Sequence, residues 1–196
     1  MECKKMPNDM VKETTIELIR HDLSKLTHPS VIGFVRYLIM NASFKTTFWF
    51  RVLSGMKGKK WLKPLYGLVY MYYKHIQYLT GIQLNIGTQI GGGIRFAHYS
   101  CIIINEYCEI GNDVTIFQGV TIGGSRGKGI PTIGNNVVLA AGAIVIGNVN
   151  IGNDVFIGAG AVITKDMADG AIVVGNPACV INHTGAEKVA YYNQRY

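Results

Sequence analysis

The sequence is poor in the residues and runs that mark disulfide-stabilised, metal-binding and membrane-spanning chains. Its four cysteines, Cys3, Cys101, Cys108 and Cys179, show no Cys-x-x-Cys spacing, so we expect reduced thiols rather than disulfides or a zinc site. No apolar run reaches the ~18 residues that a membrane-spanning helix needs, and the N-terminus lacks the charged-then-apolar layout of a signal peptide. We therefore expect a cytoplasmic protein.

Acidic residues are outnumbered by basic ones, which gives a formal net charge of +7. Such a charge suits nucleic acid, an acidic membrane or a polyphosphate ligand. Lys57, Lys59, Lys60 and Lys63 cluster beside Trp61, and several tyrosines follow. A basic, aromatic helix can lie on a membrane surface, but aromatics at this density more often pack against a neighbouring helix or a partner subunit. We expect that packing here, rather than contact with a membrane or with nucleic acid.

The first eighty residues have the apolar spacing of helices. Apolar residues recur at mixed three- and four-residue intervals over residues 11–23 and 30–54, as on one face of a helix. An aromatic segment at residues 65–79 follows the punctuation of Gly58 and Pro64. We therefore predict an α-helical N-terminal domain over residues 1–80.

After residue 80 a period of six replaces the helical one. One apolar series consists of Leu84, Ile90, Phe96, Ile102, Cys108, Val114 and Val120. A second lies two residues further on in each unit and consists of Ile104, Ile110, Ile116 and Ile122. Both resume after an interruption, over residues 133–163. Neither a helix nor an alternating strand has this period.

A six-residue repeat is typical of a coil of short parallel strands. Each unit supplies one flat side whose aliphatic residue points inward, while Gly, Asn or Asp at the corner accepts unusual backbone conformations. One coil cannot bury its inner face alone, so stacked coils share a narrow core. We predict an α+β protein in which a parallel β-helix over residues 81–182 follows the helices and a C-terminal tail occupies residues 183–196.

The six-residue register is interrupted between Ile122 and Ile133, which are eleven residues apart. The intervening GGSRGKGIPT is rich in glycine and charge, which predicts a loop that leaves the coil. A polar loop on a rigid scaffold is a common place for ligand contacts, although it can also be a simple excursion.

The run from residue 84 to about 182 resembles the hexapeptide-repeat acyltransferases with a left-handed β-helix, and within them the serine O-acetyltransferases. The resemblance rests on FAHYSCIIINEYCEIGNDVTIFQGVTIGG, the Gly123–Gly124 pair before the excursion, IGAGAVITKD at 157–166 and VGNPACVI at 174–181. It implies acetyl transfer from acetyl-CoA to a small-molecule hydroxyl, as in cysteine biosynthesis. It also implies a homotrimer, or a dimer of trimers joined through the helices.

His98 stands in the second apolar series, one unit before Ile104, where an aliphatic residue is expected. A neutral imidazole can accept a proton from a hydroxyl at pH 7. The resemblance implies that His98 is the general base that activates the acceptor hydroxyl; a hydrogen-bonded structural histidine is the alternative. To orient it we nominate Glu106, which is otherwise a water-exposed corner residue. The β-helix contains no other histidine, so we expect no metal.

The resemblance also implies that coenzyme A lies in a groove between neighbouring coils of a trimer. Small residues let its pantetheine arm approach the backbone, and a lysine can meet its phosphates. The candidate cofactor-binding residues are Gly124, Ala141, Gly142, Ala159, Gly160 and Lys165. Corner packing explains the small residues equally well. Where relatives carry a basic residue after Gly-Asn-Pro-Ala, this chain has Cys179.

The charged acceptor site of serine acetyltransferases is largely missing from the sequence. The family usually has aspartates directly before the catalytic histidine and about fifteen residues earlier, an Arg-His pair in the excursion, and an aspartate before a proline in the helices. This chain has Ala97, Gln83, Gly129–Ile130 and His28 at those positions. A saccharide hydroxyl of capsule or surface polysaccharide synthesis is therefore an alternative acceptor, and a catalytically silent scaffold is a third reading.

Overall fold

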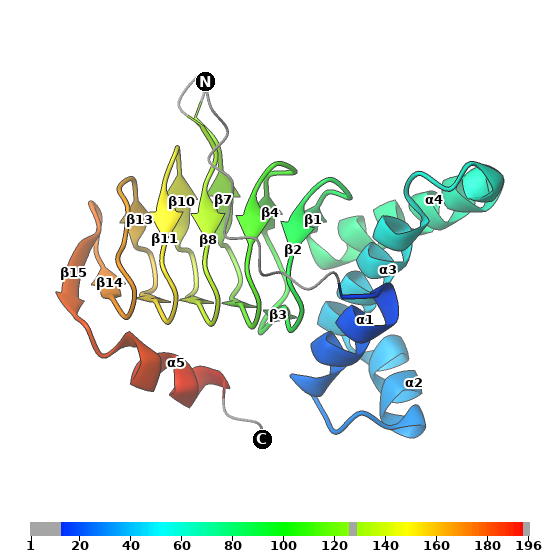
Figure 1. The fold of residues 1–196 in the computed structure, drawn as a ribbon, viewed down its shortest axis with the longest axis horizontal. Coiled ribbons are helices and arrows are strands. Elements are labelled where there is room, and N and C mark those ends of the chain that lie inside the picture. The colour runs from blue at the N-terminus through cyan, green and yellow to red at the C-terminus, as the bar shows by residue number, and fades with distance from the viewer. Residues whose placement is uncertain (1–12, 126–128, 194–196) are drawn as a thin grey trace.

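The structure is a computed structural model that describes residues 13–125 and 129–193. The helices of its first part are α1 (Thr15–Ser24), α2 (Val31–Met40), α3 (Ala42–Met56), the short 3-10 helix η1 (Lys60–Leu62) and α4 (Lys63–Thr80). Short strands follow, and helix α5 (Gly185–Asn193) comes last (Figure 1). Within the described ranges, none of these helices is long and apolar enough to cross a membrane.

The strands form three sheets that wind around one axis, with each strand pairing with the one a full coil later. Sheet A contains β1 (Ile82–Leu84), β4 (Ile102–Ile104), β7 (Thr121–Gly123), β10 (Ile144–Ile146) and β13 (Val162–Ile163). Sheet B contains β2 (Gln89–Ile90), β5 (Glu109–Ile110), β8 (Thr132–Ile133) and β11 (Asn150–Ile151). Sheet C contains β3 (Arg95–Phe96), β6 (Thr115–Ile116), β9 (Val138–Leu139), β12 (Phe156–Ile157), β14 (Ile172–Val174) and β15 (Cys179–Asn182).

The interior of the coil is filled by the six-residue series. Every residue of the two series, before and after the interruption, is buried, and Ile104, Ile122 and Val145 are each 1% exposed or less. All strand pairs are parallel except the closing pair of β14 and β15. The predicted fold, helices followed by a parallel β-helix, is confirmed.

The first coil is two residues longer than a regular one. Leu84 pairs with Ile104, twenty residues on, whereas Ile104 pairs with Ile122, eighteen residues on. The extra residues lie between Phe96 and Ile102, because the pairing of Phe96 already carries the twenty-residue offset. Our expectation of one unbroken series from Leu84 onward is therefore wrong. The two buried positions of a unit lie two residues apart. A two-residue insertion therefore places residues of one series at the structural positions of the other, while the six-residue spacing in the sequence is unchanged.

The corner between sheets B and C is held by a ladder of amide and carboxylate side chains. The side chain of Asn135 accepts from the backbone N–H of Asn112 at 2.8 Å, and that of Asn153 accepts from Asn135 in the same way. Asp113 and Asp154, at this corner, have φ of 60° and 57°. This is the left-handed conformation that Asn and Asp tolerate better than branched residues, as the corner pattern predicted.

The helices close the open end of the β-helix. The first coil has no earlier coil to pair with, and its free backbone groups are met by side chains instead. Tyr73 of α4 donates to the carbonyl of Leu84 at 2.7 Å, and Ser43 of α3 accepts from the N–H of Phe96 at 3.0 Å. An unpaired sheet edge invites pairing with another chain, so this capping protects the first coil.

A buried ion pair is the centre of this junction. Arg51 of α3 and Asp22 of α1 are 3% and 1% exposed in their side chains and form two hydrogen bonds. The guanidinium also donates to the carbonyls of Ile90 and Gly91, and the carboxylate accepts from the N–H of Gly93. Burial raises the pKa of Asp22, and the charge of Arg51 opposes that rise. The pair thus joins two helices to the first coil.

The C-terminal helix α5 turns back and covers the outer face of sheet C (Figure 1). Its Val189 is fully buried against Val138 and Phe156, which point outward from that sheet. The carbonyl of Tyr192 accepts from Arg95 at 2.8 Å, and Asn193 accepts from the hydroxyl of Thr115. The stretch that we predicted as a tail therefore includes a docked helix.

Replacing Arg51 with alanine should destabilise the protein by about 3–5 kcal/mol, because Asp22 would stay buried without its partner. Urea unfolding followed by circular dichroism measures the change. The matched control is Arg36→Ala, since Arg36 is exposed on α2, and it should change stability by about 0.5 kcal/mol or less. Equal unfolding midpoints for the two variants would contradict the role of the pair.

Candidate active site

The candidate site lies at the corner where the chain passes from sheet C to sheet A. We call it the His98 corner. It consists of residues 97–101, 117–120, 140–143 and 158–161 in successive coils. Four of the predicted cofactor-binding residues, Ala141, Gly142, Ala159 and Gly160, stack on this corner two and three coils after His98. The structure thus brings the predicted catalytic residue and most of the predicted groove to one edge of the β-helix.

A column of glycines runs along the His98 corner. Gly119, Gly142 and Gly160 have φ of 73°, 70° and 67°, a conformation that glycine adopts without the cost of a side chain. The N–H of Gly142 donates to Gln118 in the preceding coil, and that of Gly160 donates to Ala141. A side chain at Gly160 would meet nothing within 4 Å. The column therefore offers an open strip of backbone whose N–H groups hold the coils together.

Sequence reasoning missed Gly119, which begins this column. Gly142 and Gly160 are eighteen residues apart, one regular coil, and this spacing was visible in the sequence. Gly119 lies twenty-three residues before Gly142 because the excursion falls within that coil. Subtracting the excursion restores the period and would have identified it.

His98 does not occupy the inner position that the sequence suggested. It lies in the two-residue extension of the first coil and its side chain is exposed. Its ring packs against Phe117 in the next coil, with ring centres 5.9 Å apart, and Phe117 meets Tyr192 of α5 edge-on at 5.9 Å. His98 is therefore available to a ligand and is held from one side by an aromatic row.

The backbone after His98 is unusual. Ser100 and Cys101 have φ of 146° and 51°, although neither is glycine, and such conformations cost on the order of 1–3 kcal/mol each. Gly81, at the end of α4, lies against them, because a side chain there would come within 3.0 Å of the N–H of Cys101. The tight contact with α4 fixes the path of the extension that carries His98.

Glu106, nominated to orient His98, is at the next corner of the coil. Strand β4 lies between the two residues, since His98 precedes it and Glu106 follows it. A hydrogen bond to Glu106 and its charge raise the pKa of the Tyr107 hydroxyl, so the carboxylate faces that neighbour. Among the residues that the structure describes, no carboxylate forms a hydrogen bond or ion pair with His98.

Gly124 and Lys165 also lie at the corner between sheets A and B. A side chain at Gly124 would come within 3.0 Å of the carbonyl of Gly129 and 3.2 Å of Ile130. The returning limb of the excursion therefore explains why this position has no side chain. Residues 126–128 of that excursion are outside the described ranges. Lys165 is exposed and is separated from the glycine column by the width of sheet A.

The substituted acceptor positions carry no charge. Ala97 directly precedes His98 and is half-buried, and Gln83 projects from sheet A, where it pairs with Ile103 of the next coil. Ile130, on the returning limb of the excursion, packs partly against the core. The residues at these positions are therefore neutral, and their assignment to an acceptor site stays a prediction.

The cysteines and possible metal ligands do not form a further centre. Cys101 and Cys179 are exposed free thiols and Cys108 is buried; burial raises the pKa of the Cys108 thiol to about 11, which keeps it protonated. Cys3 lies outside the described residues. In the described ranges, no three His, Cys, Asp or Glu side chains gather where they could hold a metal ion.

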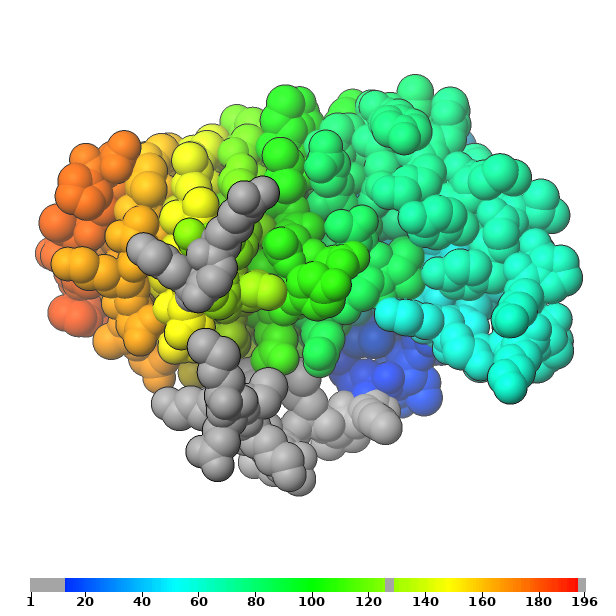
Figure 2. All heavy atoms as spheres, turned by 90° about the horizontal axis from the view of Figure 1, so that it is seen from above, coloured from blue at the N-terminus to red at the C-terminus, as the bar shows by residue number. Residues whose placement is uncertain are grey.

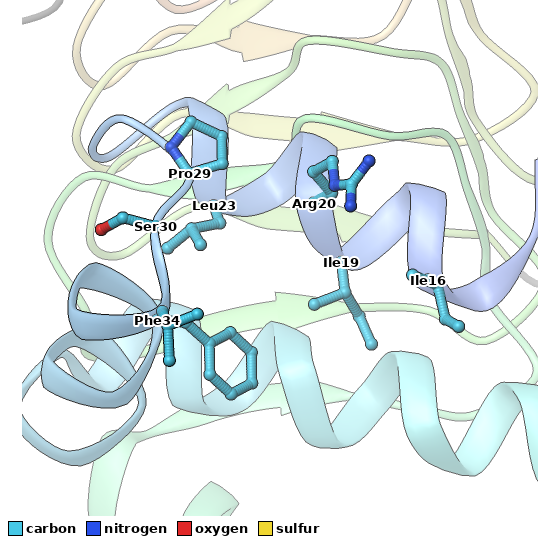
Figure 3. Close-up of a pocket in the computed structure, with 8 residues that line it drawn as sticks. Ile16, Ile19, Arg20, Leu23, Pro29, Ser30 and Phe34 are labelled. Carbon is cyan, nitrogen blue, oxygen red and sulfur yellow. The ribbon is translucent and has the colours of Figure 1, made fainter.

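A distinct hollow lies in the helical domain. Its volume is about 370 Å³, and Figure 3 shows its lining from α1 and the start of α2, including Ile19, Leu23 and Phe34. Arg20 is its one charged lining residue. All lining residues fall between positions 16 and 34, so this hollow is separate from the His98 corner.

Comparison with known proteins shows related sequences over both parts of the chain. The family model described as bacterial transferase hexapeptide (six repeats) matches residues 130–165. A serine acetyltransferase from Staphylococcus xylosus is 40% identical over 126 residues, which cover 63% of this chain and 58% of that protein. The chain thus matches little more than half the length of this relative.

A longer match and a solved structure extend the similarity. A serine acetyltransferase from Helicobacter pylori is 37% identical over 161 residues, covering 80% of this chain and 83% of that protein. A solved serine acetyltransferase in complex with CoA has a TM-score of 0.70 and 26% identity, and the alignment covers 85% of this chain and 69% of that one. The similarity spans the helices as well as the β-helix, and the chain therefore belongs to the serine acetyltransferase family.

Proposed function

We propose that the protein is an acetyl-CoA-dependent O-acetyltransferase that uses His98 as its general base. The observation that carries the proposal is the His98 corner, where an exposed imidazole and an open column of glycines share one edge of the β-helix. Membership of a family whose members are named serine acetyltransferases supports the reaction. A related structure that contains CoA supports the donor. We place the reaction in the cytoplasm, as a step of cysteine biosynthesis if serine is the acceptor.

The proposed reaction is a direct transfer. His98 removes the proton of the acceptor hydroxyl as its oxygen attacks the carbonyl carbon of the acetyl thioester. When the tetrahedral intermediate collapses, the bond from carbon to sulfur breaks and the imidazolium returns its proton to the CoA thiolate. The glycine column provides space for the extended pantetheine arm, beside Ala141 and Ala159. Lys165, across sheet A, is proposed to meet its phosphates from that corner.

L-Serine is the first candidate for the acceptor because the relatives are named serine acetyltransferases. The second candidate is the hydroxyl of a saccharide, and a specific observation favours it. Ala97, Gln83 and Ile130 provide no charge for an ammonium or a carboxylate, and no carboxylate in the described ranges contacts His98. We propose no orienting role for Glu106 within one chain, because it lies at another corner.

A trimer is proposed from the three outer faces of the β-helix. The outward row of sheet C is covered by α5, and the outward row of sheet B is polar, with Gln89, Glu109, Thr132 and Asn150. The outward row of sheet A includes Ile103, Ile144 and Val162, and Ile103 is 43% exposed. Sheet A borders the His98 corner, so a neighbouring subunit on it would form the second wall of the groove.

Changing His98 to alanine should lower kcat by on the order of 10²–10⁴-fold, because the acceptor hydroxyl would lose its base. Release of free CoA thiol from acetyl-CoA measures turnover, and calorimetry measures CoA affinity, which should change little. His183→Ala is the matched control, since His183 is exposed outside the corner. A folded His98→Ala protein with nearly full turnover would disprove the mechanism.

The apparent KM for L-serine should lie above the ordinary micromolar-to-millimolar range. Charge-assisted hydrogen bonds contribute roughly 1.5–3 kcal/mol each, and losing two weakens affinity about a hundredfold or more. Steady-state kinetics with L-serine, hexoses and nucleotide sugars makes the comparison, and Ala97→Asp should lower the serine KM if the rest of the pocket admits serine. An ordinary KM for the unmodified protein would show that other residues bind the amino acid.

Light scattering should report a trimer or a multiple of three, and Ile103→Asp should dissociate it, because a charge would be placed in the apolar row of sheet A. Activity should fall with the assembly if the groove needs both walls. Gln89→Asp on sheet B is the matched control and should leave the assembly intact. A monodisperse, fully active monomer would exclude the proposed groove.

A further inference from the structure

A long part of the chain contains no acidic residue. Between Asp22 and Glu106 there is neither Asp nor Glu, whereas ten lysines and arginines fall in the same stretch. Arg51 is neutralised by Asp22 and Lys25 by Asp113, but the other cations from Arg36 to Lys74 have no acidic residue near them in the sequence. The stretch includes α2, α3, η1 and α4, so these elements bring positive charge alone to the end of the molecule opposite β15 (Figure 1).

The outward face of α4 is mostly apolar, with the exposed His75 as a polar residue within it. Tyr73 and Ile76 point inward and are buried, while the opposite side of the helix carries large apolar residues that remain largely exposed. With their exposed fractions these are Leu65 51%, Leu68 63%, Met71 63%, Tyr72 47%, Tyr78 83% and Leu79 70%, together with Trp61 79% from η1. A contiguous exposed apolar face of this kind marks an interaction surface. Figure 2 looks onto the side of the molecule on which α4 lies.

The sequence-based expectation assigned these aromatics to packing. The structure divides them: Tyr73 and Tyr66 pack against the core and Tyr72 packs edge-on against Trp49, whereas Tyr78 and Trp61 are 83% and 79% exposed. The described part of the chain therefore leaves this surface to an external partner.

A lysine-lined hollow lies at the N-terminal end of the same face. It has a volume of about 480 Å³ and is lined by Met56, Lys57, Gly58, Lys59, Lys60, Lys63 and Tyr66. The four lysines are exposed, and no acidic residue is among the lining residues. Gly58 has a φ of 87° and open space beside it, so the backbone does not obstruct the hollow. Its chemistry fits a phosphate group or another small anion.

From the exposed apolar face of α4 and the adjoining four-lysine hollow we propose that this surface docks on an anionic lipid membrane. We call Trp61, Leu65, Leu68 and Met71 with Lys57, Lys59, Lys60 and Lys63 the α4 docking surface. An interfacial helix combines a large apolar face with lysines that reach lipid phosphates, and Trp is favoured at that depth. The lysines meet headgroups while the apolar side chains enter the acyl boundary.

Charge decides between a membrane and a second copy of the chain. Two copies that met symmetrically through this surface would bring four lysines from each into one contact, with no acidic residue from either stretch to compensate, and like charges in contact oppose association. The outward face of α2 is better suited to a second copy, because its exposed Val31, Ile32 and Ile39 are accompanied by the single cation Arg36. The α4 docking surface instead complements a negative partner.

The test is co-sedimentation of the full chain with vesicles, and its readout is independent of catalysis. We expect binding to phosphatidylcholine vesicles that contain about one third phosphatidylserine, and weak or no binding to phosphatidylcholine alone. Raising the salt concentration to about 0.5 M should weaken the binding. Each lysine near an anionic surface strengthens binding by about fivefold, so Lys57→Gln, Lys59→Gln, Lys60→Gln and Lys63→Gln together should weaken it by at least about a hundredfold.

A matched pair of apolar variants locates the contact. Trp61→Ser with Leu68→Ser should reduce binding by at least about tenfold, whereas Tyr107→Ser with Ile181→Ser should not, although Tyr107 and Ile181 are 69% and 63% exposed. Circular dichroism checks that each variant is folded.

Four results with vesicles or with the subunit assembly would overturn the proposal. These are no binding to anionic vesicles, equal binding by the lysine or apolar variants, equal binding to neutral vesicles, and a subunit assembly that dissociates when Trp61 and Leu68 are changed. Full competition by millimolar inorganic phosphate or by RNA would point to a soluble anion or a nucleic acid instead, and would also overturn it.

Discussion

The stacking of one coil on the next is the constraint on which the rest of the structure depends. A single coil has a few inward aliphatic residues and cannot exclude water from them, so its stability comes from the coils on either side. Within the stack, strand backbone groups are likewise paired with a neighbouring coil. Both ends of such a stack need a different solution. At the first coil the helices provide it through Arg51, Tyr73 and Ser43, and at the last coil the antiparallel strand β15 does so.

This constraint also explains why the candidate site lies at a corner. Inward positions must stay aliphatic, and the flat side formed by sheet C is covered by α5. A corner can lengthen without breaking the strand pairing, as it does by two residues at His98 and by a longer loop after Gly124. The lengthened corner next to α4 is the one that projects an imidazole. The regular corners stacked on it carry glycine and therefore have no side chain at that position.

The sequence was sufficient for the architecture, but not for the placement of the candidate site residues. The six-residue period predicted the β-helix and its buried residues because an inward position tolerates little besides an aliphatic side chain. It did not place His98, since the extension equals the spacing between the two inner positions and leaves the count unchanged. Pairings between distant segments, such as Asp22 with Arg51 or Tyr192 with Phe117, depend on how helices dock, and no local pattern encodes that.

The glycine column has a consequence for the scale of the site. Coils repeat at about 4.8 Å along the axis, the spacing of neighbouring strands, and the column advances by one glycine per coil. From the coil of His98 to that of Gly160 is three steps, or about 14 Å. The number of coils therefore sets the length that is available to a ligand between the imidazole and the last glycine. Evolution can change that length only in increments of one coil, whereas side-chain substitutions alter the width.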